Sequence, residues 1–337
     1  MDKHISKAYI CRSPNHLFRT LIRTMQVEEG DACVLMSDDL KPLPLDILGK
    51  YIEKVYYYPN NKINMLWSEN KSKHKLRLKE ALISTVEVCM DMNDVDEALS
   101  SSDLVFYLDS EPFVVYLMMK YKGNKMILVE DGESIYVPPK SNLNSIIKRL
   151  IGYPLPYGQS ARINELEVSF PERLKQKSLR KKAVELSTKT LLSRLSVEAK
   201  QDLLDFYKFD TDKNLSQVKD AVLLVTQPLA EDGIITEDEK WALYREIVET
   251  YKGDGELYIK AHPRELTDYR LVFPECKVIQ NSFPAELFSL SGLVFNKALT
   301  LFSTAIHLIP SNEKVILGLN YNEKVANGWL AFTGKKQ

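Results

Sequence analysis

Short apolar runs alternate with longer amphipathic stretches along most of the chain, and this alternation constrains the fold more than any other feature. In the first half, the runs predicted to be strands are residues 8–11, 32–36, 54–58, 104–108 and 126–129. The stretches predicted to be helical are residues 17–25, 71–100 and 113–121. Strands that alternate with helices predict a parallel, doubly wound α/β sheet.

The second half repeats the pattern and predicts a second domain. Its predicted strands are residues 221–226, 256–261, 276–280, 293–296 and 315–317. A chain of 337 residues also exceeds the size at which one hydrophobic core usually stops growing. Residues 146–195 are basic and rich in turn signals, so we expect a connector there. The predicted domains are therefore residues 1–195 and 196–337, facing each other across a cleft.

The composition excludes several classes of protein. The formal charge of -1 gives no overall attraction to nucleic acid, and 45% apolar residues are ordinary for a globular chain. The four cysteines have no CxxC spacing, so neither a zinc site nor a disulfide framework is indicated. The sequence shows no signal-peptide core and no apolar run near the ~18 residues of a membrane span. We expect a cytoplasmic protein, with contact to the inner face of the membrane left open.

Two polar motifs follow predicted strands, where open α/β sheets bind ligands. After residues 126–129 comes Glu130-Asp131-Gly132, in which Gly132 permits a tight turn and Asp131 can serve as a general base. The alternative is that Asp-Gly forms only a turn. After residues 256–261 comes His262-Pro263, which suits a hydrogen bond or proton donated to a phosphate, or a purely structural loop histidine.

Two further pieces of the second half could bind a nucleotide. Ser303 and Thr304 precede a predicted helix at residues 305–308, where hydroxyls cap the helix and free N–H groups can bind phosphate. Pro284 suits the first position of another helix, with Glu286 in its first turn. Glu286 is then either a surface acid favoured by the helix dipole or an acceptor for two ribose hydroxyls.

Taken together, Glu130-Asp131-Gly132, His262-Pro263 and Ser303-Thr304 resemble, in order and strand context, the motifs of the bacterial sialyltransferases of glycosyltransferase family 52. The resemblance extends loosely over residues 9–16 and 226–229. It implies the GT-B architecture of two Rossmann-like domains. It also implies an inverting, metal-independent transfer of sialic acid from CMP-sialic acid to a terminal sugar, expected to be galactose, of a bacterial lipooligosaccharide or capsule glycan.

The resemblance implies roles for the matching residues. Asp131 would deprotonate the acceptor hydroxyl and His262 would help the CMP phosphate to leave. Ser303 and Thr304 would bind the same phosphate, and Glu286 would hold the cytidine ribose. Further candidates are Gln227 and Pro263 for donor binding, and Glu130, Gly132, Asn15 and His16 for lining the cleft. No cofactor other than the donor substrate is implied.

Basic residues dominate the segment 173–194, which is either a solvated helix face or a contact with an anionic membrane. They are Arg173, Lys175, Lys177, Arg180, Lys181, Lys182, Lys189 and Arg194. Two other functions stay open: transfer from another cytidine-activated donor, CMP-Kdo or a CDP-polyol, and a non-catalytic scaffold of a glycan assembly complex. The oligomeric state also stays open, with a homodimer as one option.

Overall fold

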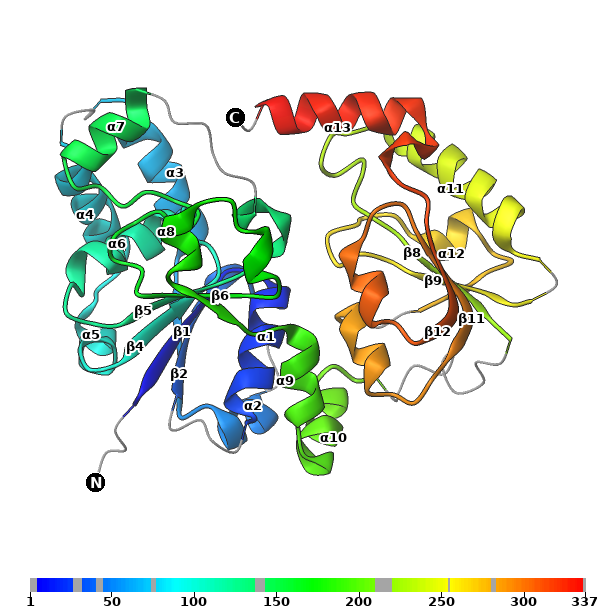
Figure 1. Cartoon of the computed structure of the whole chain (residues 1–337), viewed down its shortest axis with the longest axis horizontal. Helices are drawn as coiled ribbons and strands as arrows, with labels where there is room; N and C mark the ends of the chain where they lie inside the picture. Colours follow the sequence, from blue (N-terminus) through cyan, green and yellow to red (C-terminus); the bar gives the residue numbers. More distant parts are fainter. Residues whose placement is uncertain are drawn as a thin grey trace. The chain divides into compact units, whose positions relative to one another are not determined.

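The computed structural model describes the chain except residues 1–4, 27–31, 41–44, 74–76, 137–142, 210–219, 254, 280–282 and 336–337. It divides into two compact units, Met1–Ala199 and Lys200–Gln337, each with its own sheet and core (Figure 1). Our sequence-based boundary, between residues 195 and 196, falls just before α10 (Val197–Phe206), the helix within which the units divide.

A parallel sheet of seven strands, in the order β3-β2-β1-β4-β5-β6-β7, forms the centre of the N-terminal unit. The strands are β1 (Lys7–Cys11), β2 (Ala32–Ser37), β3 (Lys54–Tyr58), β4 (Asp103–Phe106), β5 (Met126–Val129), β6 (Glu165–Val168) and β7 (Ala183–Glu185). Every residue of β2 and β5 is buried, which explains their continuous apolar sequences.

Helices follow these strands as the alternation predicted. They are α1 (Pro14–Thr24), α2 (Leu45–Tyr51), α3 (Asn60–Asn70), α4 (Leu78–Cys89), α5 (Asn93–Ser100), α6 (Pro112–Lys120), α7 (Leu143–Leu150), α8 (Lys177–Arg180) and α9 (Thr188–Arg194), with 3-10 turns η1 (Asp38–Leu40), η2 (Gly132–Ile135) and η3 (Pro171–Arg173). Residues 112–119 of α6 are all buried. The helix predicted at residues 71–100 is in fact two helices, α4 and α5.

The region expected to be a connector, residues 146–195, contributes two strands to the sheet. It contains β6 and β7, which the sequence analysis missed because the strands are short and β7 is partly exposed at the sheet edge. The basic segment 173–194 is accordingly not one helix face, because η3, α8, β7 and α9 follow one another within it.

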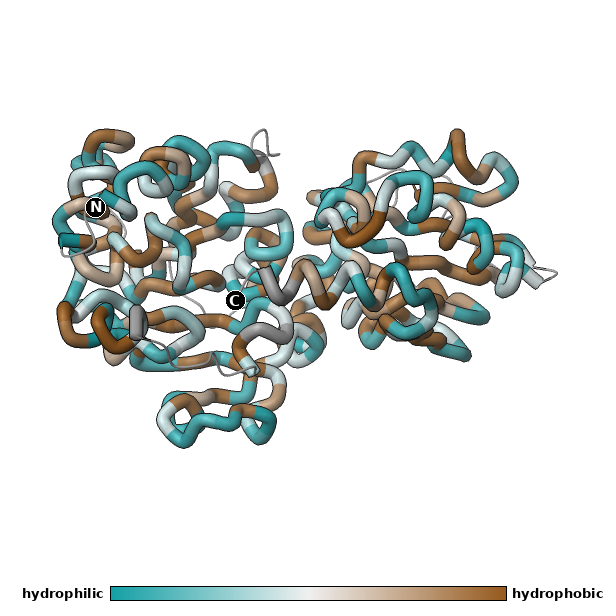
Figure 2. The backbone as a smooth tube through the Cα atoms, turned by 90° about the horizontal axis from the view of Figure 1, so that it is seen from above, coloured by the Kyte–Doolittle hydropathy of each residue, from teal (hydrophilic) through white to brown (hydrophobic). Residues whose placement is uncertain are grey.

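The C-terminal unit has a parallel five-stranded sheet in the order β10-β9-β8-β11-β12. The strands are β8 (Val222–Val225), β9 (Leu257–Lys260), β10 (Lys277–Val278), β11 (Phe295–Thr300) and β12 (Ser311–Ile316). The helical elements are α11 (Glu237–Tyr251), α12 (Tyr269–Val272), α13 (Glu323–Lys335), η4 (Ala285–Ser289), η5 (Thr304–Leu308) and η6 (Leu319–Tyr321). In Figure 2, hydrophobic segments run through the middle of each unit.

The predicted bounds of the last three strands of this unit differ from those in the structure. Residue 296 was expected to end a strand, but β11 continues to Thr300, and β12 begins at Ser311 rather than at residue 315. Lys297 in β11 and the polar residues that open β12 hide these strands, because partly exposed strand positions accept polar side chains. Of the predicted strand at residues 276–280, β10 covers Lys277–Val278, and residue 280 lies outside the described residues.

The last helix, α13, packs closely on its own unit. A Cβ added at Gly328 would lie 1.9 Å from the carbonyl oxygen of Ile234, so only glycine allows this approach of helix and loop. Trp329 of α13 contacts the ring of Phe302 edge to face, with centroids 5.0 Å apart. α13 thereby supports the residue that precedes Ser303. Among the helices in the described parts of the chain, none has the length and apolarity needed to cross a membrane.

Candidate active site

Asp131 lies at the carboxyl end of β5, separated from its last residue by Glu130, as the sequence predicted. Gly132 follows with a φ of +68°, a left-handed conformation that favours glycine and turns the chain into η2. The Asp131 side chain is 27% exposed, and its Oδ2 lies 3.2 Å from Nε2 of His16. A carboxylate is therefore placed where a ligand at the strand ends can reach it.

His16 holds this carboxylate from the first turn of α1. Ser13 caps the helix by accepting the backbone N–H of His16, and the imidazole stacks on Tyr107 with centroids 4.7 Å apart. Nδ1 accepts the backbone N–H of Arg12 at 3.1 Å, so the ring proton belongs on Nε2, which donates to Asp131. The side chain is only 1% exposed. His16 is thus a positioning residue for Asp131, buried beneath it.

The surroundings of Asp131 keep it ionised. Burial acts to raise its pKa, but the hydrogen bonds from His16 and Asn15 and the positive charge of Arg19 outweigh burial, and the pKa lies below its ordinary value. A carboxylate that is ionised at neutral pH and partly open to solvent can accept a proton from a hydroxyl group.

Glu130, predicted to line the cleft, holds the adjacent loops together. Its Oε2 accepts the hydroxyl of Tyr136 at 2.6 Å and the backbone N–H of Ser169 at 2.5 Å. The Tyr136 hydroxyl in turn accepts the backbone N–H of Phe170, and the guanidinium of Arg173 lies over the Tyr136 ring. Glu130 therefore joins the loop after β5 to the loop after β6.

His262 lies in the loop that follows β9. Its Nδ1 accepts the backbone N–H of Arg264 at 3.2 Å, which places the ring proton on Nε2. Burial, followed by the positive charges of Arg264 and Lys260, lowers the pKa of His262 to about 4. His262 is therefore an uncharged imidazole at neutral pH, suited to donate a hydrogen bond from Nε2 rather than to carry a full positive charge. Pro263, next to it, is exposed.

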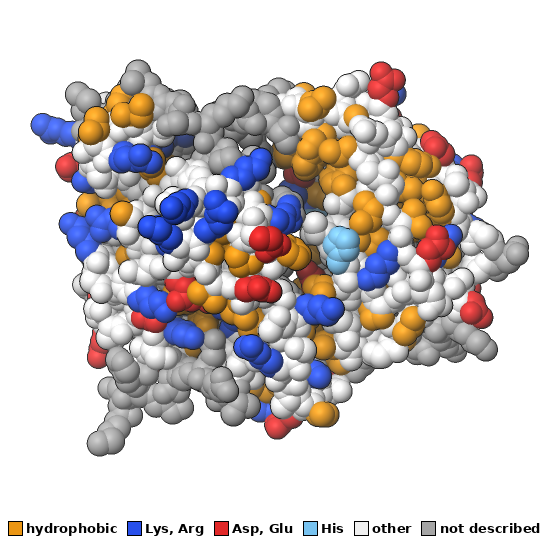
Figure 3. Space-filling model, viewed as in Figure 1, with side chains coloured by type: hydrophobic (Ala, Val, Ile, Leu, Met, Phe, Trp, Pro, Cys, Tyr) orange, Lys and Arg blue, Asp and Glu red, His pale blue; other side chains and the backbone are white. Residues whose placement is uncertain are grey.

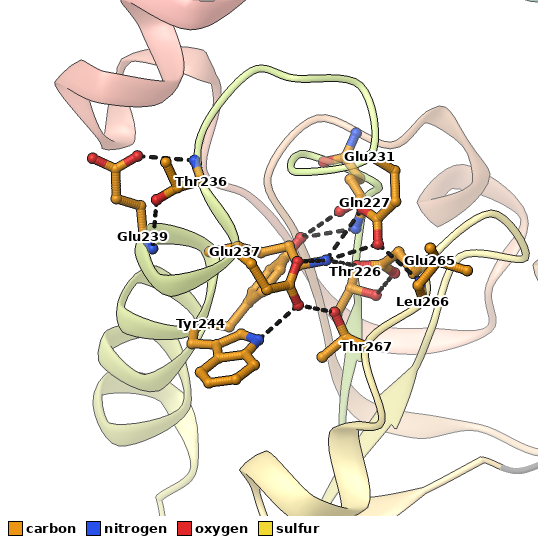
Figure 4. A network of polar contacts seen from close by, with 12 residues as sticks. Thr226, Gln227, Glu231, Thr236, Glu237, Glu239, Tyr244, Glu265, Leu266 and Thr267 are labelled. Carbon is orange, nitrogen blue, oxygen red and sulfur yellow. Dashed lines mark hydrogen bonds and ion pairs between the residues drawn. The ribbon is translucent and has the colours of Figure 1, made fainter.

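A polar network holds the backbone of this loop, as Figure 4 shows around Glu265 and Thr226. One carboxylate oxygen of Glu265, Oε2, accepts the backbone N–H of His262 at 2.7 Å and the hydroxyl of Thr226. The other oxygen, Oε1, accepts the hydroxyl of Tyr269 at 2.5 Å. Glu265 thus ties the loop after β9 to the end of β8 and to α12.

Lys240 of α11 supplies the positive charge of the network. Its side chain is 0% exposed, and Nζ lies 3.0 Å from a carboxylate oxygen of Glu231, 3.0 Å from one of Glu237 and 3.8 Å from Oε1 of Glu265. Glu231 also accepts the backbone N–H of Leu266 at 2.8 Å. The buried cation therefore neutralises Glu231 and Glu265, whose carboxylates accept backbone N–H groups of the His262 loop.

Gln227 belongs to the same support rather than to an open surface. Its Oε1 accepts the backbone N–H of Phe302 at 3.0 Å, and its own backbone N–H donates to the Tyr244 hydroxyl at 2.8 Å. Because Phe302 precedes Ser303, Gln227 links the ends of β8 and β11. These contacts make Gln227 a positioning residue for the loop that carries Ser303.

Ser303 and Thr304 follow the carboxyl end of β11 directly, because β11 extends to Thr300. Ser303 makes no capping hydrogen bond through its side chain, so the predicted cap is absent, and η5 is one 3-10 turn rather than an α-helix. Ser303 donates its backbone N–H to the Thr300 hydroxyl at 3.3 Å. Thr304 is exposed.

Glu286 lies in η4, which contacts η5. Its side chain is half-buried, and Pro284 stands one position before the helix rather than at its first residue. The contact between η4 and η5 brings Glu286 into the same part of the unit as Ser303 and Thr304.

Sequence reasoning missed Glu265, Lys240 and Tyr107. Only one local signal could have indicated Glu265, namely that it is an acidic residue three positions after His262. Nothing along α11 distinguishes Lys240 from a surface lysine, because its burial depends on carboxylates from two loops. Among the described residues, no group of three or more His, Cys, Asp or Glu side chains is arranged to hold a metal ion.

Two parallel α/β sheets with polar groups at the carboxyl ends of their strands define a GT-B protein. The chain belongs to glycosyltransferase family 52, whose sequence profile matches residues 50–318.

The proteins that are similar to the chain include one relative and two solved structures. An uncharacterized protein of Haemophilus influenzae (strain ATCC 51907 / DSM 11121 / KW20 / Rd) is 31% identical over 204 residues, which span 60% of this chain and 65% of that protein's length. The UDP-GlcNAc 2-epimerase from Methanocaldococcus jannaschii has the same fold, with a TM-score of 0.50, 14% identity and coverage of 96% of this chain and 92% of that one. The spinosyn rhamnosyltransferase SpnG complexed with thymidine diphosphate gives a TM-score of 0.47 at 13% identity, over 95% of this chain and 84% of that one.

Proposed function

We propose that the protein is an inverting sialyltransferase that transfers sialic acid from CMP-sialic acid to a galactose of a bacterial surface glycan, such as a lipooligosaccharide or capsule. Membership of family 52 and the motifs at residues 130–132, 262–263 and 303–304 support this donor. The observation that carries the chemistry is the ionised Asp131 at the end of β5, held by His16.

In this reaction Asp131 accepts the proton of the acceptor hydroxyl as the hydroxyl oxygen forms a bond to the anomeric carbon of sialic acid. The bond from that carbon to the CMP phosphate oxygen breaks, and its electron pair stays on the phosphate. Nε2–H of His262 and the hydroxyls of Ser303 and Thr304 stabilise the charge that develops there. His262 acts by hydrogen bonding, because its low pKa leaves the ring neutral at pH 7, without the acidic second proton of an imidazolium.

Glu286 is proposed to accept the ribose hydroxyls of the donor, since η4 contacts η5 and both donor-side elements belong to one unit. The departing CMP carries a single phosphate, so we propose that hydrogen bonds from His262, Ser303 and Thr304 stabilise its charge without a metal ion. We place the reaction in the cytoplasm, supported by four free cysteines, three of them buried.

The experiment that tests this function offers the purified protein CMP-sialic acid, CMP-Kdo and a CDP-polyol in parallel, each with a panel of galactosides. Mass spectrometry then detects the added sugar. We expect a sialylated galactoside from CMP-sialic acid alone. A product from CMP-Kdo or the CDP-polyol alone would assign a different donor, and binding of a donor without any product would favour a non-catalytic scaffold.

A further inference from the structure

α7 of the N-terminal unit presents apolar side chains to solvent. Ile146, Ile147 and Leu150 are 50%, 37% and 82% exposed. Their spacing places them on one side of the helix. In the place that α7 occupies in Figure 1, Figure 3 shows hydrophobic side chains at the surface with Lys and Arg side chains beside them. Apolar side chains gathered in this way mark an interaction surface, whereas scattered ones do not.

Positive charge is crowded around this helix. Lys148 and Arg149 belong to α7, and a Cβ added at Gly152 would lie 3.2 Å from Nζ of Lys79. Burial and then the positive charge of Lys71 lower the pKa of Lys148, which shows that a further cation lies near α7. The exposed apolar face is thus bordered by cations from α4 and from the end of α3.

A basic cavity of about 700 Å³ adjoins α7. Its cationic lining residues are Lys122, Lys125, Arg149 and Arg162, and none of the described residues that line it is acidic. Lys125 also pairs with Glu165 at 2.8 Å. Residues 122–125 precede β5 directly and Arg162 shortly precedes β6, so the cavity lies at the amino-terminal ends of these strands. Asp131 follows the opposite end of β5, and the cavity is therefore separate from the candidate active site.

Backbone hydrogen bonds end α7 next to the cavity. Gly152 has a φ of +66°, its N–H donates to the carbonyl of Arg149 at 3.0 Å, and the N–H of Tyr153 donates to the carbonyl of Lys148 at 2.8 Å. This pair of hydrogen bonds is the Schellman ending of a helix. The chain then passes directly into the lining residues 152–155, so the exposed helix and the cavity form one surface.

We propose that α7 and this cavity form a docking surface for an anionic lipid bilayer. Ile146, Ile147 and Leu150 enter the boundary between headgroups and acyl chains, and Arg149 and Arg162 bind lipid phosphates. An apolar helix face bordered by cations is complementary to such a membrane in both hydrophobicity and charge.

This surface differs from the basic segment 173–194 considered from the sequence. In that segment the Arg173 guanidinium lies over the rings of Tyr136 and Phe170, and Nζ of Lys182 donates to the carbonyls of Gly158 and Ser160. Two of its cations are therefore used within the protein. The docking surface does not rest on the proposed function, because it lies at the other end of the sheet and is tested by binding alone.

The test is sedimentation of the full chain with vesicles of phosphatidylcholine alone or of equal parts phosphatidylcholine and phosphatidylglycerol. The variants are Ile146→Ser with Leu150→Ser, and Arg149→Glu with Arg162→Glu. Matched controls are Leu271→Ser, an equally exposed leucine of the C-terminal unit, and Arg180→Glu with Lys181→Glu in the segment 173–194. Thermal melting and gel filtration of every variant report folding and self-association.

We expect the wild-type chain to bind the anionic vesicles, less tightly as salt is raised, and to leave phosphatidylcholine vesicles unbound. Each α7 or cavity pair should lower the partition constant about tenfold or more, with both controls unchanged. Absence of wild-type binding would overturn the proposal. Normal vesicle binding by both the α7 variant and the cavity variant would also overturn it. Loss of binding by the Arg180 and Lys181 control alone would place the membrane contact in the segment 173–194. A change in self-association of the α7 variant, without a change in vesicle binding, would make α7 an interface between copies of the chain.

Discussion

Nε2 of His16 lies 3.2 Å from Oδ2 of Asp131, across 115 residues of sequence. The imidazole is buried and its other nitrogen accepts the backbone N–H of Arg12, so the ring can turn neither toward solvent nor away from the carboxylate. The proposed base is therefore oriented by a residue that a substrate cannot reach.

Replacement of His16 tests this orientation. His16→Phe retains an aromatic ring against Tyr107 but removes the donor to Asp131, so kcat should fall by about tenfold or more, the worth of one hydrogen bond to a charged group. Burial of Asp131 would then be less opposed and its pKa would rise. The acid limb of the kcat/KM profile should move to higher pH, and His16→Gln, which can still donate, should move it less.

The lowered pKa of Asp131 also sets the direction in which stability changes with pH. The pKa of Asp131 is lowered by folding, so Asp131 adds stability above its unfolded pKa and loses it as pH falls through the folded value. An acid limb that stays in place in His16→Phe, with kcat unchanged, would show that His16 only fills space.

His262 should act on the chemical step. We expect His262→Ala to lower kcat more than it weakens CMP binding, because the hydrogen bond strengthens as the phosphate gains charge. Since the pKa of His262 is about 4, the kcat/KM profile of the wild type should show no transition near 6.5. A rise in donor KM alone would make His262 a binding residue. A loss of activity as pH rises through about 6.5, absent in His262→Ala, would mean that the imidazolium is the active form.

Lys240 should contribute more to the stability of the C-terminal unit than a lysine in an exposed ion pair does. Lys240→Met removes a fully buried cation and leaves the carboxylates of Glu231, Glu237 and Glu265 without their counter-charge, which should cost about 3–5 kcal/mol of unfolding free energy in the C-terminal unit. Urea denaturation measures this loss. Lys277→Met, which breaks the exposed pair with Glu256, is the matched control and should cost at most about 1 kcal/mol. Equal losses of unfolding free energy in both variants would contradict this role of Lys240.

Chelation should leave activity intact. The proposed charge stabilisers are His262, Ser303 and Thr304, so transfer in excess EDTA should match transfer in buffer. Activity that vanishes with EDTA and returns with Mg²⁺ or Mn²⁺ would require a metal in the reaction.

The sequence allowed prediction of the elements whose signal is local. β5 has the predicted bounds because a fully buried parallel strand is a continuous apolar run. β3, a partly exposed edge strand, has them because its valine and three tyrosines favour a strand. β6 and β7 were missed, since each is short and β7 is partly exposed at the sheet edge. The positions of Asp131 and His262 after their strands were also predictable, because the buried strands β5 and β9 end close to where their apolar runs end.

The partners of these residues were not predictable. His16 meets Asp131 because β1 and β5 flank β4 in the sheet, which brings their carboxyl ends to one edge. Lys240 is buried because loops after β8 and β9 supply its carboxylates. Both relationships depend on tertiary packing, so they cannot be predicted from the residue type at single positions.

The most direct measurement is sialyl transfer from CMP-sialic acid to a galactoside by the wild type and by Asp131→Asn, with donor binding measured on the same samples. Asparagine has nearly the shape of aspartate but cannot accept the proton as a carboxylate does. We predict that the wild type forms the sialylated product and that Asp131→Asn loses about 10²- to 10⁴-fold in rate while its affinity for CMP changes little. Near-normal turnover by Asp131→Asn would contradict the assignment of Asp131 as the base.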